Sequence, residues 1–189
     1  VQKARATSML LPQVVGLEQG KSYLFLLQNN NELRPGGGFI GSFAKIDFES
    51  GKLKKLAVND IYAIDGMLKI KVEPPKEIRE DLAQKDWFLR DSNWEPDFPT
   101  NARQAEWFFT KETGEKVAGV VALDVYAMEN LLEVVGPLKL SDYEETITSE
   151  NLAERAEFYS EIGFFPGSTS KKDFLSSLAR QIFLQLQEG

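Results

Sequence analysis

The chain has 189 residues, of which 22 are basic and 29 acidic, and its formal net charge at pH 7 is −7. It contains no cysteine and no histidine, which excludes thiol nucleophiles, disulfides, Cys/His zinc sites and histidine acid–base catalysis. The acidic balance makes nucleic acid a poor partner, because binding it relies on clustered Lys and Arg. Hydrophobic residues at 42% and charged residues at 27% are typical of a globular domain.

The first half of the chain predicts a small sheet. We expect strands over 23–27, 39–48 and 53–58, with a hairpin turn at Ser50-Gly51 joining the last two. Within the second strand, Ile40, Ala44, Ile46 and Phe48 are predicted to share one face. Residues 59–67 are expected to form a polar connection, followed by a short helix over 76–83 and a long loop over 84–98.

The second half alternates helices with strands. A helix is predicted over 100–113, a buried strand over 117–123, a helix over 125–135 and a short strand over 138–140. Two further helices are predicted, one over 149–161 and one that begins with the capping box Ser170-x-x-Asp173. Each helix has one apolar face, so the sequence predicts an α/β or α+β fold in which helices cover a central mixed sheet.

The ends of the chain bear on its organisation. The apolar stretch 8–17 is too short to span a bilayer, which needs about 20 residues. Because the chain starts at Val1 without a recognisable signal peptide, we expect it to be a piece of a longer protein. Residues 1–21 are then an extension leading from an upstream anchor, and residues 22–189 a single globular domain.

The first motif that could carry chemistry is QNNNELRPGGGFIGS, residues 28–42, which follows a buried strand. Its glycines would let backbone N–H groups approach an anion, and Arg34 could clamp a phosphate or carboxylate in bidentate fashion. Asn30, Gly37 and Gly38 are candidate ligand contacts in this loop. The alternative is a tight structural connection whose glycines allow positive φ, with Arg34 paired to an acid.

The second motif, VNDIYAID at 58–65, also follows a strand. Asp60 is a candidate catalytic residue and metal ligand, and Tyr62 a candidate ligand contact. A carboxylate pair here could hold Mg²⁺, which binds phosphates through one or two carboxylates and water. The alternative is that Asp60 and Asp65 only cap turns.

The third motif is RDSNWEPDFPT at 90–100. Arg90 and Asp91 are candidate catalytic residues, Asp91 also a candidate metal ligand, and Trp94 and Asp97 candidate ligand contacts. Aromatic rings beside acids and an arginine suit a sugar or an amphiphile. They equally suit a long loop held to the core by its aromatic side chains.

These stretches together resemble a widespread bacterial family of extracytoplasmic domains of unknown function. The resemblance lies in residues 26–42 and 90–100, and in VAGVVALD at 117–124 with LLEVVGP at 131–137. It implies a cell-envelope location outside the cytoplasm, with the membrane reached through a segment outside this chain.

The order of elements also resembles the LytR-CpsA-Psr phosphotransferases, which have a three-layer sandwich and transfer glycopolymers from polyprenyl-pyrophosphate carriers. That resemblance places Arg34 near a pyrophosphate and Asp60 near Mg²⁺. The family's Arg-Asp pair in its second motif is Asn59-Asp60 here. It implies a domain, catalytic or degenerate, that binds a polyprenyl-phosphate-linked glycan or similar anionic amphiphile.

Two functional hypotheses therefore stand side by side, and a third option is a structural spacer domain in a larger surface protein. In the first, Arg34, Asp60, Arg90 and Asp91 converge on a Mg²⁺-bound pyrophosphate and stabilise the charge that develops on its bridging oxygen. In the second, the domain is a non-catalytic module that binds a glycan or a protein through its aromatic segment.

Overall fold

The computed structural model describes residues 12–30 and 32–161, together with residues 174, 177, 178, 180–182, 184 and 185. Its strands are β1 (Lys21–Asn29), β2 (Phe39–Glu49), β3 (Lys52–Asp60), β4 (Gly119–Asp124), β5 (Leu138–Leu140) and β6 (Glu145–Ile147). Its α-helices are α2 (Ile61–Asp65), α3 (Lys76–Asp81), α4 (Phe98–Thr113), α5 (Val125–Val135) and α6 (Leu152–Glu161). Two short 3₁₀ helices are η1 (Leu89–Asp91) and η2 (Ser141–Tyr143).

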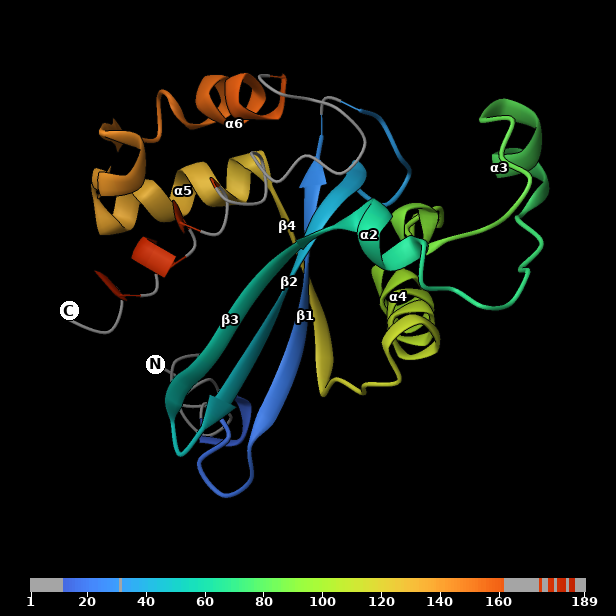
Figure 1. Cartoon of the computed structure of the whole chain (residues 1–189), viewed down its shortest axis with the longest axis horizontal. Coiled ribbons are helices and arrows are strands. Elements are labelled where there is room, and N and C mark those ends of the chain that lie inside the picture. The colour runs from blue at the N-terminus through green and yellow to red at the C-terminus, as the bar shows by residue number, and fades with distance from the viewer. Residues whose placement is uncertain are drawn as a thin grey trace.

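The centre of the fold is a four-stranded mixed sheet in the order β3-β2-β1-β4. β1 is antiparallel to β2 and parallel to β4, so the chain crosses from β3 to β4 through α2, α3 and α4. Figure 1 shows α2 and α4 on one side of the sheet and α5 and α6 on the other. The predicted architecture, a mixed sheet covered by helices, is confirmed.

A bulge in β2 corrects one detail of the prediction. Leu27 pairs with Ser42, but the next residue of β1, Gln28, pairs with Ile40, which leaves Gly41 as the extra residue. The bulge reverses the alternation of side chains, because one inserted residue moves the following residues to the other face. Ile40 therefore packs in a different hydrophobic cluster from Ala44 and Ile46.

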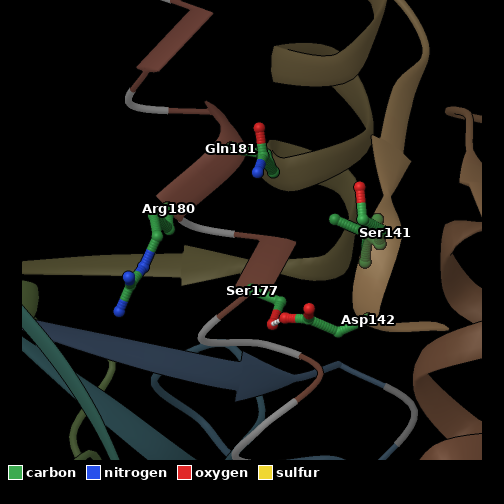
Figure 2. Close-up of a pocket in the computed structure, with 6 residues that line it drawn as sticks. Ser141, Asp142, Ser177, Arg180 and Gln181 are labelled. Carbon is green, nitrogen blue, oxygen red and sulfur yellow. Dashed lines mark hydrogen bonds between the residues drawn. The ribbon is translucent and has the colours of Figure 1, made fainter.

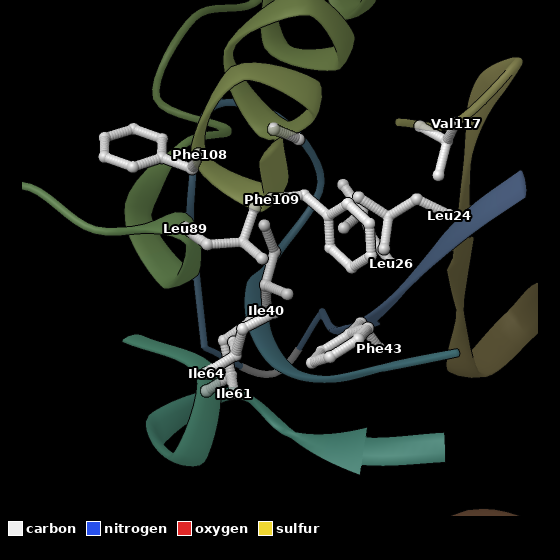
Figure 3. Close-up of a cluster of buried hydrophobic side chains, with 11 residues drawn as sticks. Leu24, Leu26, Ile40, Phe43, Ile61, Ile64, Leu89, Phe108, Phe109 and Val117 are labelled. Atoms are coloured by element: carbon white, nitrogen blue, oxygen red, sulfur yellow. The ribbon is translucent and has the colours of Figure 1, made fainter. Parts of the chain in front are cut away.

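The main hydrophobic core lies between the sheet and the helices α2 and α4 (Figure 3). Phe108 and Phe109 of α4 are 1% and 2% exposed, and the ring of Phe109 packs edge-on against Phe43 of β2. Burying side chains of this size stabilises the fold by roughly 1.5–3 kcal/mol each. Leu89 of η1 is fully buried in the same cluster, which fixes the otherwise irregular segment before α4.

A second core joins α5, α6 and the small sheet formed by β5 and β6 with Phe174, Leu178 and Ile182. Those three C-terminal residues are helical and buried, which agrees with the predicted last helix where it is described. Its predicted capping box, Ser170 and Asp173, lies outside the described residues. No helix in the described part of the chain is long and apolar enough to cross a membrane.

Local signals explain where the longer helices begin and end. The Asp97 carboxylate accepts a hydrogen bond from the Thr100 backbone N–H and caps α4, which ends at Gly114 with φ +77°. Asp124 caps α5 in the same manner. The prediction was wrong for 59–67, where α2 replaces a simple connection, and incomplete for 84–98, where η1 forms. Both elements are too short to show a helical repeat in sequence.

Candidate functional site

The glycine-rich loop between β1 and β2 packs directly against the third motif. The Gly36 N–H donates to the Asn93 carbonyl at 3.0 Å, and the Asn93 side-chain amide donates to the Gly38 carbonyl at 2.6 Å. A Cβ on Gly36 would lie 2.4 Å from the Asn93 carbonyl oxygen, and one on Gly38 would lie 2.4 Å from the carbonyl oxygen of Asn29. Gly36 is therefore required by close packing between the two motifs, and Gly38 by close packing within the loop itself.

Arg34 leaves this loop and lies between two aromatic rings. Its guanidinium is 5.3 Å from the centre of the Phe39 ring and 6.0 Å from that of Trp94. Its Nη1 donates to the neighbouring Leu33 carbonyl, and its buried Nε is 3.8 Å from Asp91 without a hydrogen bond. The side chain is 14% exposed. Arg34 is thus fixed in position while much of its donor capacity remains unused by the protein.

Arg90, by contrast, uses all three of its guanidinium nitrogens in contacts with neighbouring side chains. Its Nη1 donates to Asp65 at 2.8 Å, its Nη2 donates to Gln84 at 3.1 Å, and its Nε lies 3.4 Å from Asp91. The guanidinium also packs on the rings of Phe88 and Tyr62. Burial raises the pKa of Asp65 to about 6, and the Arg90 hydrogen bond limits that rise. Burial also raises the pKa of Asp91, against the opposing charges of Arg90 and Arg34.

Asp60 ends β3 and caps α2. Its Oδ1 accepts hydrogen bonds from the backbone N–H groups of Tyr62 and Ala63, at 2.8 and 3.3 Å. The Tyr62 side chain connects this cap to the charged cluster, because its ring packs against Phe39 and under Arg90. The structure therefore joins Arg34, Asp91 and Arg90 by ion pairs, whereas Asp60 adjoins them through Tyr62.

Glu112 of α4 also belongs to this cluster, although it was not among the site residues predicted from the sequence. It is 5% exposed, and burial followed by the charge of Asp65 raises its pKa to about 8. Only its position in the helix could have indicated it, since it lies three and four residues after the buried Phe109 and Phe108. Its spacing from these two residues places Glu112 on the buried face of α4. A glutamate in an amphipathic helix is ordinarily assigned to the solvent-exposed face, so the sequence gives only a weak indication of this residue.

The remaining predicted contacts are placed as follows. Asn30 is half-buried beside Gly38, whose own backbone is buried against Asn29. Gly37 is exposed, with φ +109°. Trp94 is half-buried over Arg34, and Asp97 is exposed and occupied by the α4 cap.

The two carboxylates predicted to hold Mg²⁺ have surroundings that do not fit a divalent cation. Asp60 uses one oxygen for two backbone N–H groups, and Asp91 is 2% exposed between two guanidinium groups that repel a cation. Within the described ranges, no group of three or more acidic side chains could hold a metal ion.

A separate cavity of about 200 Å³ lies beside η2. Figure 2 shows Ser141 and Asp142 facing Ser177 and Gln181 from the C-terminal helix, and Arg180 also lines the cavity. The Ser177 hydroxyl donates to Asp142 at 3.5 Å. None of the predicted site residues lines this cavity.

Fold and site together define a mixed α/β domain with a partly buried Arg–Asp cluster at one end of its sheet. The chain belongs to the family described as "Protein of unknown function (DUF4012)", whose family model matches residues 18–159. The first and third motifs, residues 28–42 and 90–100, and the whole charged cluster lie within the matched range. A search of curated proteins finds no match.

Proposed function

We propose that this domain binds an anionic amphiphile of the bacterial cell envelope, of the polyprenyl-phosphate-linked glycan type, and that it does so without catalysing transfer. The extracytoplasmic location and an upstream membrane anchor are part of the proposal, and they rest on the sequence resemblance. The observation that carries the binding function is the state of Arg34. It is held between Phe39 and Trp94 but makes only one hydrogen bond among the described residues.

This arrangement suits a phosphate that arrives from solvent. Fixing the guanidinium between two rings in advance reduces the side-chain entropy that a ligand must overcome. The long 3.8 Å approach to Asp91 leaves the charge of Arg34 only partly compensated. The oxygens of a bound phosphate would compensate this charge by accepting charge-assisted hydrogen bonds, which arginine can form in bidentate fashion. The flanking rings offer apolar surface to the adjoining part of an amphiphile.

The other predicted catalytic residues support binding more than transfer. Arg90 is committed to Asp65, Gln84 and Asp91, so it cannot move onto a reacting phosphate without leaving buried acids unpaired. Asp60 is committed to the cap of α2. General acid–base catalysis needs a titratable group within hydrogen-bonding reach of the reacting atom. Of the two predicted acids, Asp60 caps α2 and Asp91 is 2% exposed between Arg34 and Arg90.

The test uses farnesyl phosphate, a short polyprenyl phosphate, in titration calorimetry with and without Mg²⁺. Loss of one charge-assisted contact costs roughly 1.5–3 kcal/mol, so Arg34→Ala should weaken binding about 10- to 150-fold. The matched control is Arg79→Ala, which removes an arginine that is 49% exposed on α3 and should bind like the wild type. Inorganic phosphate in a parallel titration measures how much of the affinity depends on the apolar tail.

Absence of binding by the wild type would reject this proposal. The second candidate, a glycan- or protein-binding module, would then take its place. It is favoured by exposed aromatic side chains near the same end of the sheet, with Tyr62 at 56% and Phe98 at 41% exposure. Surface aromatic groups of this size often mark interaction sites.

A further inference from the structure

The Glu112 carboxyl group has no hydrogen-bond partner for either oxygen within the part of the chain that the structure describes. It lies on α4, which packs against both α2 and η1, and the charges of Asp65 on α2 and Arg90 on η1 both act on it. The Oδ1 of Asp65 is also buried and unpartnered. A buried polar group without a partner is uncommon in a stable protein and calls for a physical reason.

We propose that Glu112 is a proton-operated latch. As a neutral acid it allows α4 to pack against the Asp65–Arg90 pair, and loss of its proton loosens α2, η1 and α4 from one another. This inference goes beyond the proposed binding function, because it concerns the free protein and needs no ligand.

The balance of charges is the physical basis. Asp65 and Asp91 face Arg90 directly, and Arg34 faces Asp91 from the other side, so two guanidinium groups already balance two carboxylates. Gln84, the remaining polar side chain on Arg90, brings no charge. Ionised Glu112 would add an uncompensated negative charge in a buried site, which is costly unless it is paired and hydrogen-bonded.

The pKa of Glu112 agrees with this geometry. Burial, followed by the negative charge of Asp65, raises it to about 8 from the usual 4.5. The backbone amide of Leu89 and the charge of Arg90 oppose this rise in the pKa. Neither the Leu89 N–H nor the Arg90 guanidinium is placed to donate a hydrogen bond to a Glu112 oxygen. At neutral pH the group is therefore mostly a neutral acid.

The sign of the pH effect follows. Between pH 4.5 and about 8 the folded state holds a proton on Glu112 that the unfolded state has lost, so stability falls as pH rises through this range. Asp65 contributes in the same direction only up to about pH 6. The raised pKa of Asp91 adds a decrease of the same sign, so the contribution of Glu112 from pH 6 to 8 is the part that Glu112→Gln removes. That part amounts to as much as a tenfold fall in the folding equilibrium constant per pH unit.

Loosening at Glu112 would extend to the candidate site. Arg90 links the Asp65 side of the cluster to Asp91, and Asp91 is the acid that faces Arg34. A change in how Arg90 is held therefore changes the charge and position of the group beside Arg34.

The experiment titrates the wild-type protein with ¹³C-labelled glutamate carboxyl groups by NMR, and measures urea unfolding from pH 6 to 8.5. We expect one glutamate to titrate near pH 8, and that resonance to be missing in Glu112→Gln. The variant should remain folded and lose the decrease in stability between pH 6 and 8, because its amide is neutral throughout. Glu106→Gln, on the same helix, should keep the wild-type profile.

Two results would overturn the latch. One is a spectrum in which the resonance lost in Glu112→Gln titrates near 4.5 in the wild type. The other is a pH dependence of stability in Glu112→Gln that matches the wild type. The NMR titration decides the first point even if the variant folds poorly, because it is made on the wild-type protein.

Discussion

Replacing Arg90 with methionine should strongly destabilise the domain. The change removes a 2.8 Å hydrogen bond to Asp65 and an ion pair to Asp91, and it leaves both acids in sites where they are 3% and 2% exposed. Removing one partner of a buried ion pair costs about 3–5 kcal/mol, because a charge is left without compensation. Methionine keeps the apolar contact with Phe88, so the loss measures charge rather than packing.

The loss of stability in Arg90→Met has an upper limit, because an acid left without its arginine can take up a proton. The usual pKa of Asp65 is 3.8, so relative to the unfolded chain its protonation costs about 4.4 kcal/mol at pH 7 and only about 1.6 kcal/mol at pH 5. The expected deficit of Arg90→Met is therefore largest near neutral pH and smaller at pH 5. This direction follows because a folded-state pKa above the unfolded value loses stability as pH rises.

Urea unfolding followed by tryptophan fluorescence measures this loss. With an m-value near 2 kcal/mol/M, a deficit of about 4 kcal/mol lowers the midpoint by about 2 M. The control Arg79→Met removes an exposed ion pair with Glu73 and should cost less than about 1 kcal/mol. Adding Asp65→Asn to Arg90→Met should recover part of the deficit, with a coupling energy of about 0.5–3 kcal/mol.

The reasoning would fail if Arg90→Met stayed within about 1 kcal/mol of the wild type at pH 7. It would also fail if the deficit were the same at pH 5 and pH 7, because the loss would then come from packing rather than charge.

The other predictions concern the loop and the α2 cap. Gly36→Ala should destabilise the domain by about 1–3 kcal/mol in thermal unfolding, because its Cβ would clash with the Asn93 carbonyl. The control Gly66→Ala, whose Cβ would lie 3.4 Å from the nearest atom, should be nearly neutral. Equal stability of the two variants would argue against the close packing of the loop. Asp60→Ala should cost about 1 kcal/mol and Asp60→Ser much less, because serine can still cap α2. If both variants also lost farnesyl phosphate binding, Asp60 would be a ligand contact after all.

Much of the fold follows from the sequence. The four strands of the central sheet, β5, the start of α5 and the end of α4 are set by local patterns, namely apolar runs, capping acids and a terminal glycine. The three-residue strand β6 was not predicted. Such signals act over a few residues, so they can be identified without knowing what packs against them. The sequence also indicates the first and third motifs as special, because each combines an arginine with acids, and the first adds three glycines directly after a buried strand.

The tertiary structure alone decides which groups meet. Arg90 pairs with Asp65, 25 positions away, and Asn93 holds Gly38 across 55 positions. The Gly41 bulge moves Ile40 to the opposite face from Ala44, which strict alternation does not allow. Glu112 becomes part of the charged cluster only because α4 packs across α2 and η1. Burial and long-range pairing are properties of the assembled fold. They join charged residues of the second and third motifs into one interior network, and the guanidinium of Arg34 lies at its edge with part of its donor capacity free.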